Sequence, residues 1–252
     1  MPPLLRLHRR AFQDDPALDV AVSRAILNRV AAGELPETLR LTRPGAMVAF
    51  GRQDVASASY LPAVRAARAG GFEAIERLAG GRAAVFHEGT LAIAHARPDD
   101  EPQAHIYPRF EEWSGLIAAA LRRLGVEAGV GEVPGEYCPG GYSVHAGGRI
   151  KLAGIGQKLI KHAGHLGGVL VVGDGARVRD VLVPVYEALG LEFDPTTVGA
   201  VEDELPGISL DDVETVLLDE LSALYEVEEA ELDAETIALA RELRAEHLAP
   251  AA

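Results

Sequence analysis

Short strand-like runs joined by tight glycine turns, with amphipathic helices between them, most constrain the fold of this chain. Two turns stand out: a His-Glu-Gly turn after residue 86 and the pair Gly147-Gly148. Strand-like runs surround these turns at residues 72–77, 83–86, 91–96, 142–146 and 150–160. Strands joined by hairpins pair antiparallel, whereas a regular alternation of strands and helices gives a parallel sheet. The pattern therefore predicts an α+β fold.

Helices are predicted where apolar residues recur every three or four positions. In residues 15–32, Leu18, Val22 and Ile26 share one side, and Gly33 follows as a stop signal. Further helices are predicted over residues 60–69, 109–124, 177–189 and 233–248, with another after Ser209. Additional strands are predicted over residues 38–41, 46–50 and 165–172.

The charge distribution divides the chain. Residues 201–252 carry 16 acidic and two basic residues, so they account for the whole net charge of −14, and the first 200 residues are neutral overall. We therefore predict a main domain of residues 1–195 and an acidic helical C-terminal segment of residues 196–252 packed on it. The acidic segment is either a set of solvated helices or a steering surface for a partner.

Several classes of protein are disfavoured by composition. No window approaches the roughly 18 apolar residues of a membrane span, and residues 1–10 lack the apolar core of a signal peptide. One cysteine, Cys138, builds neither an internal disulfide nor a cysteine-rich zinc site. Dinucleotide, Walker-type and metalloprotease motifs are missing. We expect a cytoplasmic protein with no nucleic-acid partner, no membrane attachment and no metal site.

A glycine pair flanked by arginines is the first stretch with chemical potential. Gly80 and Gly81 allow the backbone to approach a ligand closely, and Arg77 and Arg82 stand on either side. Guanidinium groups and backbone N–H donors together suit an anionic group. An ordinary turn with solvent-facing arginines explains the same pattern. His87 follows, just before the second turn.

Lys151 lies in an otherwise apolar strand. Strict alternation places its side chain on a face with Ala153 and Ile155, and places Gly154 on the other face. Burial of a lysine is costly unless the amine meets an anion or loses its proton. The alternative is an edge-strand lysine that reaches water.

Cys138 lies in a loop rich in proline and glycine, where a thiol is more accessible than in a core. Cations near such a thiol favour the thiolate. A passive thiol is the alternative. No acidic residue occurs between Glu136 and Asp174, a stretch that contains Arg149, Lys151, Lys158 and Lys161. This cationic stretch is either one exposed strand face or an anion-binding surface.

Together these stretches resemble the family of lipoate–protein ligases and octanoyltransferases. The run from Arg77 to Leu91, with its glycine pair, Val-Phe-His and Gly-Thr-Leu, is similar to the signature loop of the family. The run from Lys151 to Gln157 is similar to the segment that carries the essential lysine of the family. Glu76 and Ala79 depart from the pattern, because an arginine and a small hydroxyl residue are usual there.

The resemblance implies an α+β fold with a central mixed, largely antiparallel sheet flanked by helices, as in biotin protein ligases, and a short helical C-terminal segment. It implies that residues 1–195 form the catalytic domain and that Lys151 is catalytic. The residues expected to bind substrate are Arg77, Gly80, Gly81, Arg82, His87, Gly89, Gly154 and Gln157.

Two reactions fit the resemblance. Cys138 lies 13 residues before Lys151, which is similar to the position of the nucleophile in some octanoyltransferases of the family. We therefore favour transfer of an octanoyl or lipoyl group from acyl carrier protein, through a Cys138 thioester, to a lysine of a lipoyl domain. The expected acceptors are the 2-oxoacid dehydrogenase complexes and the glycine cleavage H protein, and no covalently bound cofactor is expected.

The first alternative is a lipoate–protein ligase, which uses ATP and Mg²⁺ to form a lipoyl-adenylate on the loop of Gly80 and Gly81. A non-catalytic module that binds an acyl or lipoyl group is the second. A biotin ligase is less compatible with the cysteine loop around Cys138.

Overall fold

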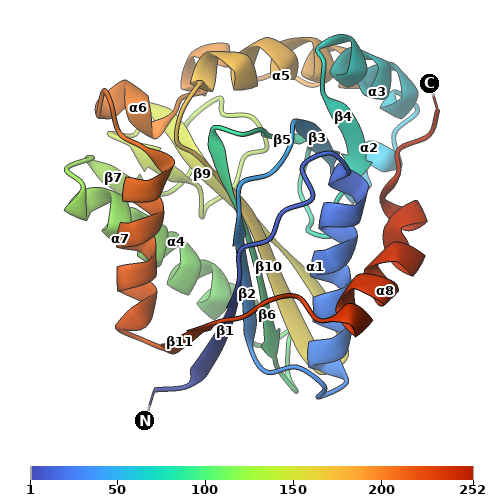
Figure 1. Cartoon of the computed structure of the whole chain (residues 1–252). Coiled ribbons are helices and arrows are strands. Elements are labelled where there is room, and N and C mark those ends of the chain that lie inside the picture. Colours follow the sequence, from blue (N-terminus) through green and yellow to red (C-terminus); the bar gives the residue numbers. More distant parts are fainter. Residues whose placement is uncertain (1, 252) are drawn as a thin grey trace.

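An eight-stranded sheet forms the centre of the computed structural model, which describes residues 2–251 (Figure 1). Its strands are β1 (Leu4–His8), β2 (Thr38–Thr42), β6 (Thr90–Pro98), β7 (Ala128–Val130), β8 (Val144–Ala146), β9 (Ile150–Ile160), β10 (Ala163–Val171) and β11 (Glu226–Glu229). They lie in the order β11-β1-β2-β6-β10-β9-β8-β7. β1 pairs in parallel with β2 and β11, and the other neighbours pair antiparallel. The predicted mixed, largely antiparallel sheet is confirmed.

A smaller sheet carries the glycine pair. It consists of β3 (Met47–Phe50) between β4 (Glu73–Glu76) and β5 (Ala84–Phe86), with β3 parallel to β4 and antiparallel to β5. The loop from β4 to β5 contains Gly80 and Gly81, so this sheet fixes both ends of the loop.

Helices cover both faces of the large sheet. They are α1 (Pro16–Ala31), α2 (Arg52–Val55), α3 (Tyr60–Ala69), α4 (Ile106–Arg123), α5 (Gly175–Leu189), α6 (Val201–Glu204), α7 (Leu210–Ser222) and α8 (Ala234–Leu243). Figure 1 shows α4 and α7 on one face, α1 and α8 on the other, and α3 beside α5 near the small sheet. In the described part of the chain, no helix combines the length and apolar character needed to cross a membrane.

Local signals explain where these helices begin. The Asp15 side chain accepts a hydrogen bond from the Leu18 N–H at 3.2 Å, and Pro16 occupies the first turn of α1. The Ser209 side chain caps α7, and the Ser209 N–H donates to the Asp212 carboxylate at 3.0 Å. The side chain of Asp233 caps α8.

The sequence predicted a helical C-terminal segment, but in the structure this segment also contains a strand. This strand is β11, which extends the large sheet by pairing with β1. The sequence of β11 is Glu-Val-Glu-Glu, whose side chains are mostly exposed, so no apolar alternation marks it as a strand. Backbone hydrogen bonding at the sheet edge forms this strand instead. The division of the chain near residue 195 remains a prediction.

Arginines of the preceding residues meet the acidic surplus of the C-terminal segment. Arg29 is the most buried example, and its guanidinium contacts Asp233 at 2.6 Å and Glu235 at 2.9 Å. On α7, Glu214 contacts Arg9 at 2.6 Å and Arg43 at 3.0 Å. The charge imbalance along the sequence is therefore partly cancelled in space.

Candidate active site

One pocket of about 460 Å³ brings together most of the residues that the sequence singles out. It lies between the Cys138 loop (residues 131–143), the strand pair β9 and β10, and the glycine loop (residues 77–82). Seven predicted site residues line it: Arg77, Gly80, Gly81, Cys138, Lys151, Gly154 and Gln157. Its wall also contains Phe110 and Tyr142, whose rings stack with centres 5.1 Å apart. Such a wall suits an apolar substrate chain.

The glycine loop supplies the donors that hold the Cys138 sulfur. The Arg82 backbone N–H donates to Sγ at 3.1 Å, and Arg77 Nη2 lies 3.8 Å from the same atom. Cys138 is half-buried and has a left-handed backbone with φ of 43°. This conformation costs a residue with a side chain roughly 1–2 kcal/mol. The thiolate is the nucleophilic form of a cysteine, and these two contacts fix the direction of the sulfur.

Close packing of the backbone around Cys138 requires glycine at two positions. Gly81 has φ of 95°, and a Cβ there would lie 2.6 Å from Arg77 Nη2 and 2.9 Å from Cys138 Sγ. A Cβ at Gly51 would collide with the carbonyl oxygen of Gly81. The glycine loop therefore approaches both the start of α2 and the sulfur more closely than any side chain permits.

Lys151 is buried against the Cys138 loop, with 2% of its side chain exposed, so it does not reach water as an edge-strand lysine would. Its Nζ donates to Glu136 Oε1 at 3.2 Å, to the Tyr137 carbonyl at 3.0 Å and to the Cys138 carbonyl at 2.9 Å. Burial lowers the pKa of Lys151 below its usual range, and the Glu136 carboxylate opposes that shift.

A β-bulge changes the face on which Lys151 lies, so the prediction from strict alternation is wrong. His145 of β8 pairs with Lys151 of β9, but the preceding residue of β8, Val144, pairs with Ala153, two residues further along β9. A bulge of this kind inserts one extra residue and reverses the alternation beyond it. A Cβ at Gly154 would lie 3.2 Å from Lys151 Cε, so Gly154 and Lys151 occupy the same side of the strand.

Glu136 is the site residue that the sequence reasoning missed. Its side chain is fully buried, and its Oε1 also accepts hydrogen bonds from Ser143 Oγ at 2.6 Å and the Gly140 N–H at 3.0 Å. A signal for it existed, because a buried lysine calls for a nearby anion. Glu136 is the acidic residue closest in sequence to Cys138.

The two arginines of the glycine loop have different roles in its geometry. Arg82 Nη1 contacts Asp54 Oδ1 at 3.2 Å, and burial raises the pKa of Asp54 above its usual range. Arg77 Nη2 donates to the Arg82 carbonyl at 2.6 Å, which folds the loop around the guanidinium. The Arg77 Nε is buried and has no hydrogen-bond partner within residues 2–251. Arg77 is thus a cation beside the sulfur with an unused donor.

Gln157 joins the pocket to α4. Its carbonyl oxygen accepts from the Gly80 N–H at 3.2 Å, which places the glycine loop against β9. Its side chain accepts from Arg109 Nε at 2.8 Å and donates to the Ile106 carbonyl at 2.7 Å. The side-chain amide of Gln157 therefore binds Arg109 and the Ile106 carbonyl, and the Gln157 backbone carbonyl binds the glycine loop.

His87 and Gly89 are not brought to this pocket. They form the turn between β5 and β6, where the Gly89 N–H donates to His87 Nδ1 at 3.0 Å and the Thr90 hydroxyl donates to the His87 carbonyl at 2.8 Å. The His87 side chain is buried in that turn, and burial lowers the pKa of His87. Their contacts in the structure are those of a turn.

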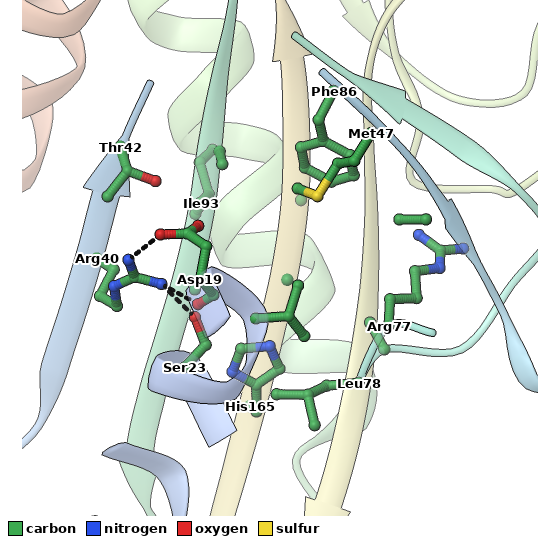
Figure 2. A pocket seen from close by; sticks show the side chains of 17 residues that line it. Asp19, Ser23, Arg40, Thr42, Met47, Arg77, Leu78, Phe86, Ile93 and His165 are labelled. Atoms are coloured by element: carbon green, nitrogen blue, oxygen red, sulfur yellow. Dashed lines mark hydrogen bonds and ion pairs between the residues drawn. The ribbon is translucent and has the colours of Figure 1, made fainter. Parts of the chain in front are cut away.

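A second, smaller cavity of about 70 Å³ lies beyond the glycine loop, between α1 and the two sheets (Figure 2). Arg77 lines both this cavity and the larger pocket. Most of its wall is apolar: Val20, Met47, Ala49, Leu78, Ala79, Phe86, Ala92, Ile93 and Ala94. Buried His165 also lines it, and burial lowers the pKa of His165 to about 3, so the imidazole is neutral. At another part of the wall, Arg40 Nη2 donates to Asp19 Oδ1 at 2.7 Å.

The cationic stretch does not form one uniformly basic face. Arg149 Nη2 contacts Glu204 Oε1 at 2.9 Å, and His162 Nδ1 lies 3.0 Å from Asp100 Oδ1. Lys151 is buried with Glu136. Acidic residues from other segments therefore meet part of the stretch that is acid-free in sequence. Within residues 2–251, no group of three or more His, Cys, Asp or Glu side chains is arranged to hold a metal ion.

The fold is that of lipoate–protein ligases. The crystal structure of lipoate-protein ligase A bound with ATP superposes with a TM-score of 0.76 over 97% of this chain and 95% of that chain, at 21% sequence identity. A putative lipoate protein ligase from Thermoplasma acidophilum, protein Ta0514, gives a TM-score of 0.74 over 98% of this chain and 95% of that chain, at 21% identity. At these identities the likeness shows the fold alone.

Sequence comparison shows the family. Residues 15–222 match the lipoyl protein ligase A/B catalytic domain, and the chain belongs to that family. Among curated relatives, octanoyl-GcvH:protein N-octanoyltransferase of Geobacillus kaustophilus is 30% identical over 188 residues, which is 72% of this chain and 64% of that protein. The protein of the same name in Bacillus velezensis is 28% identical over 194 residues, 76% of this chain and 67% of that protein. The first match thus spans less than two thirds of the relative.

Proposed function

We propose that this protein transfers an octanoyl group to a lysine of a lipoyl-domain protein through a thioester on Cys138. The observation that carries the proposal is the position of the Cys138 sulfur, which lies in the 460 Å³ pocket with the Arg82 N–H at 3.1 Å and the Arg77 guanidinium at 3.8 Å. The names of the curated relatives support the same reaction. They also favour octanoyl-GcvH over octanoyl acyl carrier protein as the donor.

In the first half-reaction, the Cys138 thiolate attacks the carbonyl carbon of the donor. Arg77 is the cation best placed to stabilise the negative oxygen that forms, because it lines the pocket and its Nη2 lies 3.8 Å from the sulfur. With an amide donor, the lysine amine of GcvH takes up a proton and leaves. With a carrier-protein donor, the thiol of the carrier leaves instead.

In the second half-reaction, the lysine amine of the acceptor attacks the thioester carbonyl. The new amide bond forms, the C–S bond breaks, the amine gives up a proton and the Cys138 thiolate returns. Lipoyl domains of 2-oxoacid dehydrogenases are the acceptors that this proposal names. A lipoyl group in place of octanoyl follows the same steps.

The octanoyl chain runs from Cys138 past Arg77 into the smaller cavity of Figure 2. Arg77 lines both spaces, and Ala79 and Gly80 are neighbours in the loop between them. The apolar wall of the cavity suits a hydrocarbon chain, since burial of each methylene group contributes about 0.8 kcal/mol. His165 is neutral there, and the charges of Arg40 and Asp19 in the same wall are paired with each other at 2.7 Å.

Intact-mass spectrometry tests the proposal. The protein is incubated separately with octanoyl-GcvH and with octanoyl acyl carrier protein. We expect an octanoyl adduct that hydroxylamine removes, that is absent in Cys138→Ser, and that disappears when a lipoyl-domain acceptor is added. Absence of the adduct together with lipoate-dependent pyrophosphate exchange from ATP and Mg²⁺ would establish the ligase alternative instead. Binding of octanoate without either reaction would indicate a non-catalytic module.

A further inference from the structure

The hydrogen bonds of Lys151 within the protein leave its ammonium no N–H donor for a substrate. A lysine ammonium has three N–H donors and no acceptor. All three reach protein oxygens in this structure: Glu136 Oε1, the Tyr137 carbonyl and the Cys138 carbonyl. In this arrangement the ammonium has no further N–H to offer a substrate carbonyl. Its direct targets are instead the backbone on both sides of the Tyr137–Cys138 peptide bond.

The Cys138 backbone is the part of the site that needs such a restraint. Its φ of 43° is left-handed, and in the described chain only His162 and Asp174 share this feature among non-glycine residues. The Cys138 carbonyl, 2.9 Å from Lys151 Nζ, belongs to the same residue whose sulfur meets the Arg82 N–H at 3.1 Å. A fixed carbonyl therefore helps to fix the direction of the side chain.

Glu136 anchors Lys151 from the opposite side. Its side chain is 0% exposed and accepts four hydrogen bonds, from Lys151 Nζ, Ser143 Oγ, the Gly140 N–H and the Val133 N–H. Val133, Gly140 and Ser143 belong to the Cys138 loop and lie on both sides of Cys138 in sequence. The Glu136 carboxylate thus binds both ends of the Cys138 loop and also the Lys151 amine, which binds the middle of the loop.

We propose that Glu136 is a positioning residue, which acts through Lys151 to hold the Cys138 loop in the conformation that presents the sulfur to the pocket. The consequence for acyl transfer rests on the proposed function, whereas the positioning of the thiol does not. Glu136 does not face the reacting atoms in this scheme. Its effect is transmitted by the ammonium and the two carbonyls that the ammonium binds.

The charge of Glu136 gives this role a distinctive signature. Burial and the charge of Arg77 disfavour the ammonium form of Lys151, whereas the Glu136 carboxylate and a Cys138 thiolate favour it. Without the carboxylate, Lys151 loses its proton at a lower pH. A neutral amine has two N–H donors and a lone pair, so it cannot bind three acceptors. The loop is then released as the pH rises.

The test is acylation of Cys138 by p-nitrophenyl octanoate, followed by nitrophenolate release and intact mass over a range of pH, with Cys138→Ser as the blank. A small activated ester reports the positioning of the thiol even where no protein donor is accepted. Failure of the proposed function, seen as no transfer from GcvH or carrier protein, is thereby separated from failure of this inference.

Glu136→Gln is the main variant, and Ser143→Ala is the matched control that removes another hydrogen bond to the same carboxylate without changing its charge. For Glu136→Gln we expect the rate to fall with rising pH, with a midpoint about one pH unit or more below that of the parent protein. For Ser143→Ala we expect the parent midpoint. The inference would be overturned if the Glu136→Gln variant acylated at the parent rate, or if its rate were lower by the same factor at every pH.

A second comparison covers the case in which Glu136→Gln does not fold because it buries an unpaired lysine. Lys151→Met and the double variant Glu136→Gln/Lys151→Met contain no such lysine. The amide oxygen of glutamine can still accept the hydrogen bonds from Ser143 and Gly140. If the charge of Glu136 acts through Lys151, the two variants therefore acylate at the same rate, within about twofold, since contacting residues that act as a unit are non-additive. A double variant that is tenfold slower than Lys151→Met would show that Glu136 acts by another route.

Discussion

Substitution of Gly81 by alanine tests the close approach of backbone and sulfur. A Cβ at this position would lie 2.9 Å from Cys138 Sγ and 2.6 Å from Arg77 Nη2, and the φ of 95° is one that alanine rarely adopts. Gly80→Ala is the matched control. A Cβ at Gly80 would meet only the Gln157 carbonyl oxygen, at an ordinary 3.9 Å.

The magnitude follows from two costs. The positive φ costs alanine about 1–3 kcal/mol, so Gly81→Ala should lose that much free energy of unfolding. Relief of the contact at 2.9 Å requires the sulfur, the loop or both to move by at least about 0.5 Å, and misplacement on the order of 1 Å costs about 100-fold in rate. We therefore expect Cys138 acylation to slow by roughly 10- to 100-fold.

The assay measures the rate of octanoyl adduct formation by intact mass and the free energy of unfolding by urea denaturation, for both variants. Gly80→Ala should stay within about 0.5 kcal/mol of the parent in stability. An acylation rate in Gly81→Ala equal to that of the parent protein would refute the proposed contact. A larger loss of stability in Gly80→Ala than in Gly81→Ala would do the same.

Two further predictions concern the cavity and a buried carboxylate. Ala92→Leu adds apolar volume to the wall of the 70 Å³ cavity. Intact-mass measurements should therefore show fewer octanoyl adducts, while butyryl adducts persist. Equal loss of both adducts would exclude this cavity as the site of the acyl chain. Burial opposes ionisation of Glu37, but His95 and Arg97 outweigh it and hold the pKa of Glu37 at about 2, against an ordinary 4.5. The stabilisation from ionised Glu37 is thus complete above pH 4.5 and lost as the pH falls toward 2. In urea titrations, Glu37→Gln should be about 3 kcal/mol less stable than the parent at pH 7 and nearly as stable as the parent near pH 2. A stability difference that does not change with pH would contradict this.

Elements with strong local signals could be predicted from the sequence to within a few residues. The helix over residues 60–69 and the strand over residues 150–160 have the predicted bounds as α3 and β9. β1 and β11 were missed. β1 is only five residues long, although its buried Leu5 and Leu7 alternate with Arg6. β11 has no apolar alternation and forms through pairing with β1. The bulge in β9 was also missed, since one extra residue opposite β8 leaves no mark in the apolar spacing.

The sequence indicated which residues form the site better than it indicated the partners that these residues contact. The glycine pair, Cys138 and Lys151 were identifiable because each is costly or unusual in its surroundings: adjacent glycines, a lone thiol in a loop and a lysine in an apolar strand. The partners of these groups follow from the tertiary fold. Asp54 reaches Arg82 from α2, at 3.2 Å, although 28 residues separate them in the chain. His87 satisfied the sequence pattern but lies in a separate turn.

The geometry gives the two cations of the site, Lys151 and Arg77, different surroundings. Lys151 is buried, and its donors are taken by Glu136 and the backbone at Tyr137 and Cys138. Arg77 lies beside the sulfur, lines both cavities and retains an unpartnered Nε within residues 2–251. A change at Lys151 should therefore alter the presentation of the thiol to every electrophile, including alkylating reagents. A change at Arg77 should chiefly alter reactions in which a negative oxygen develops at the carbonyl.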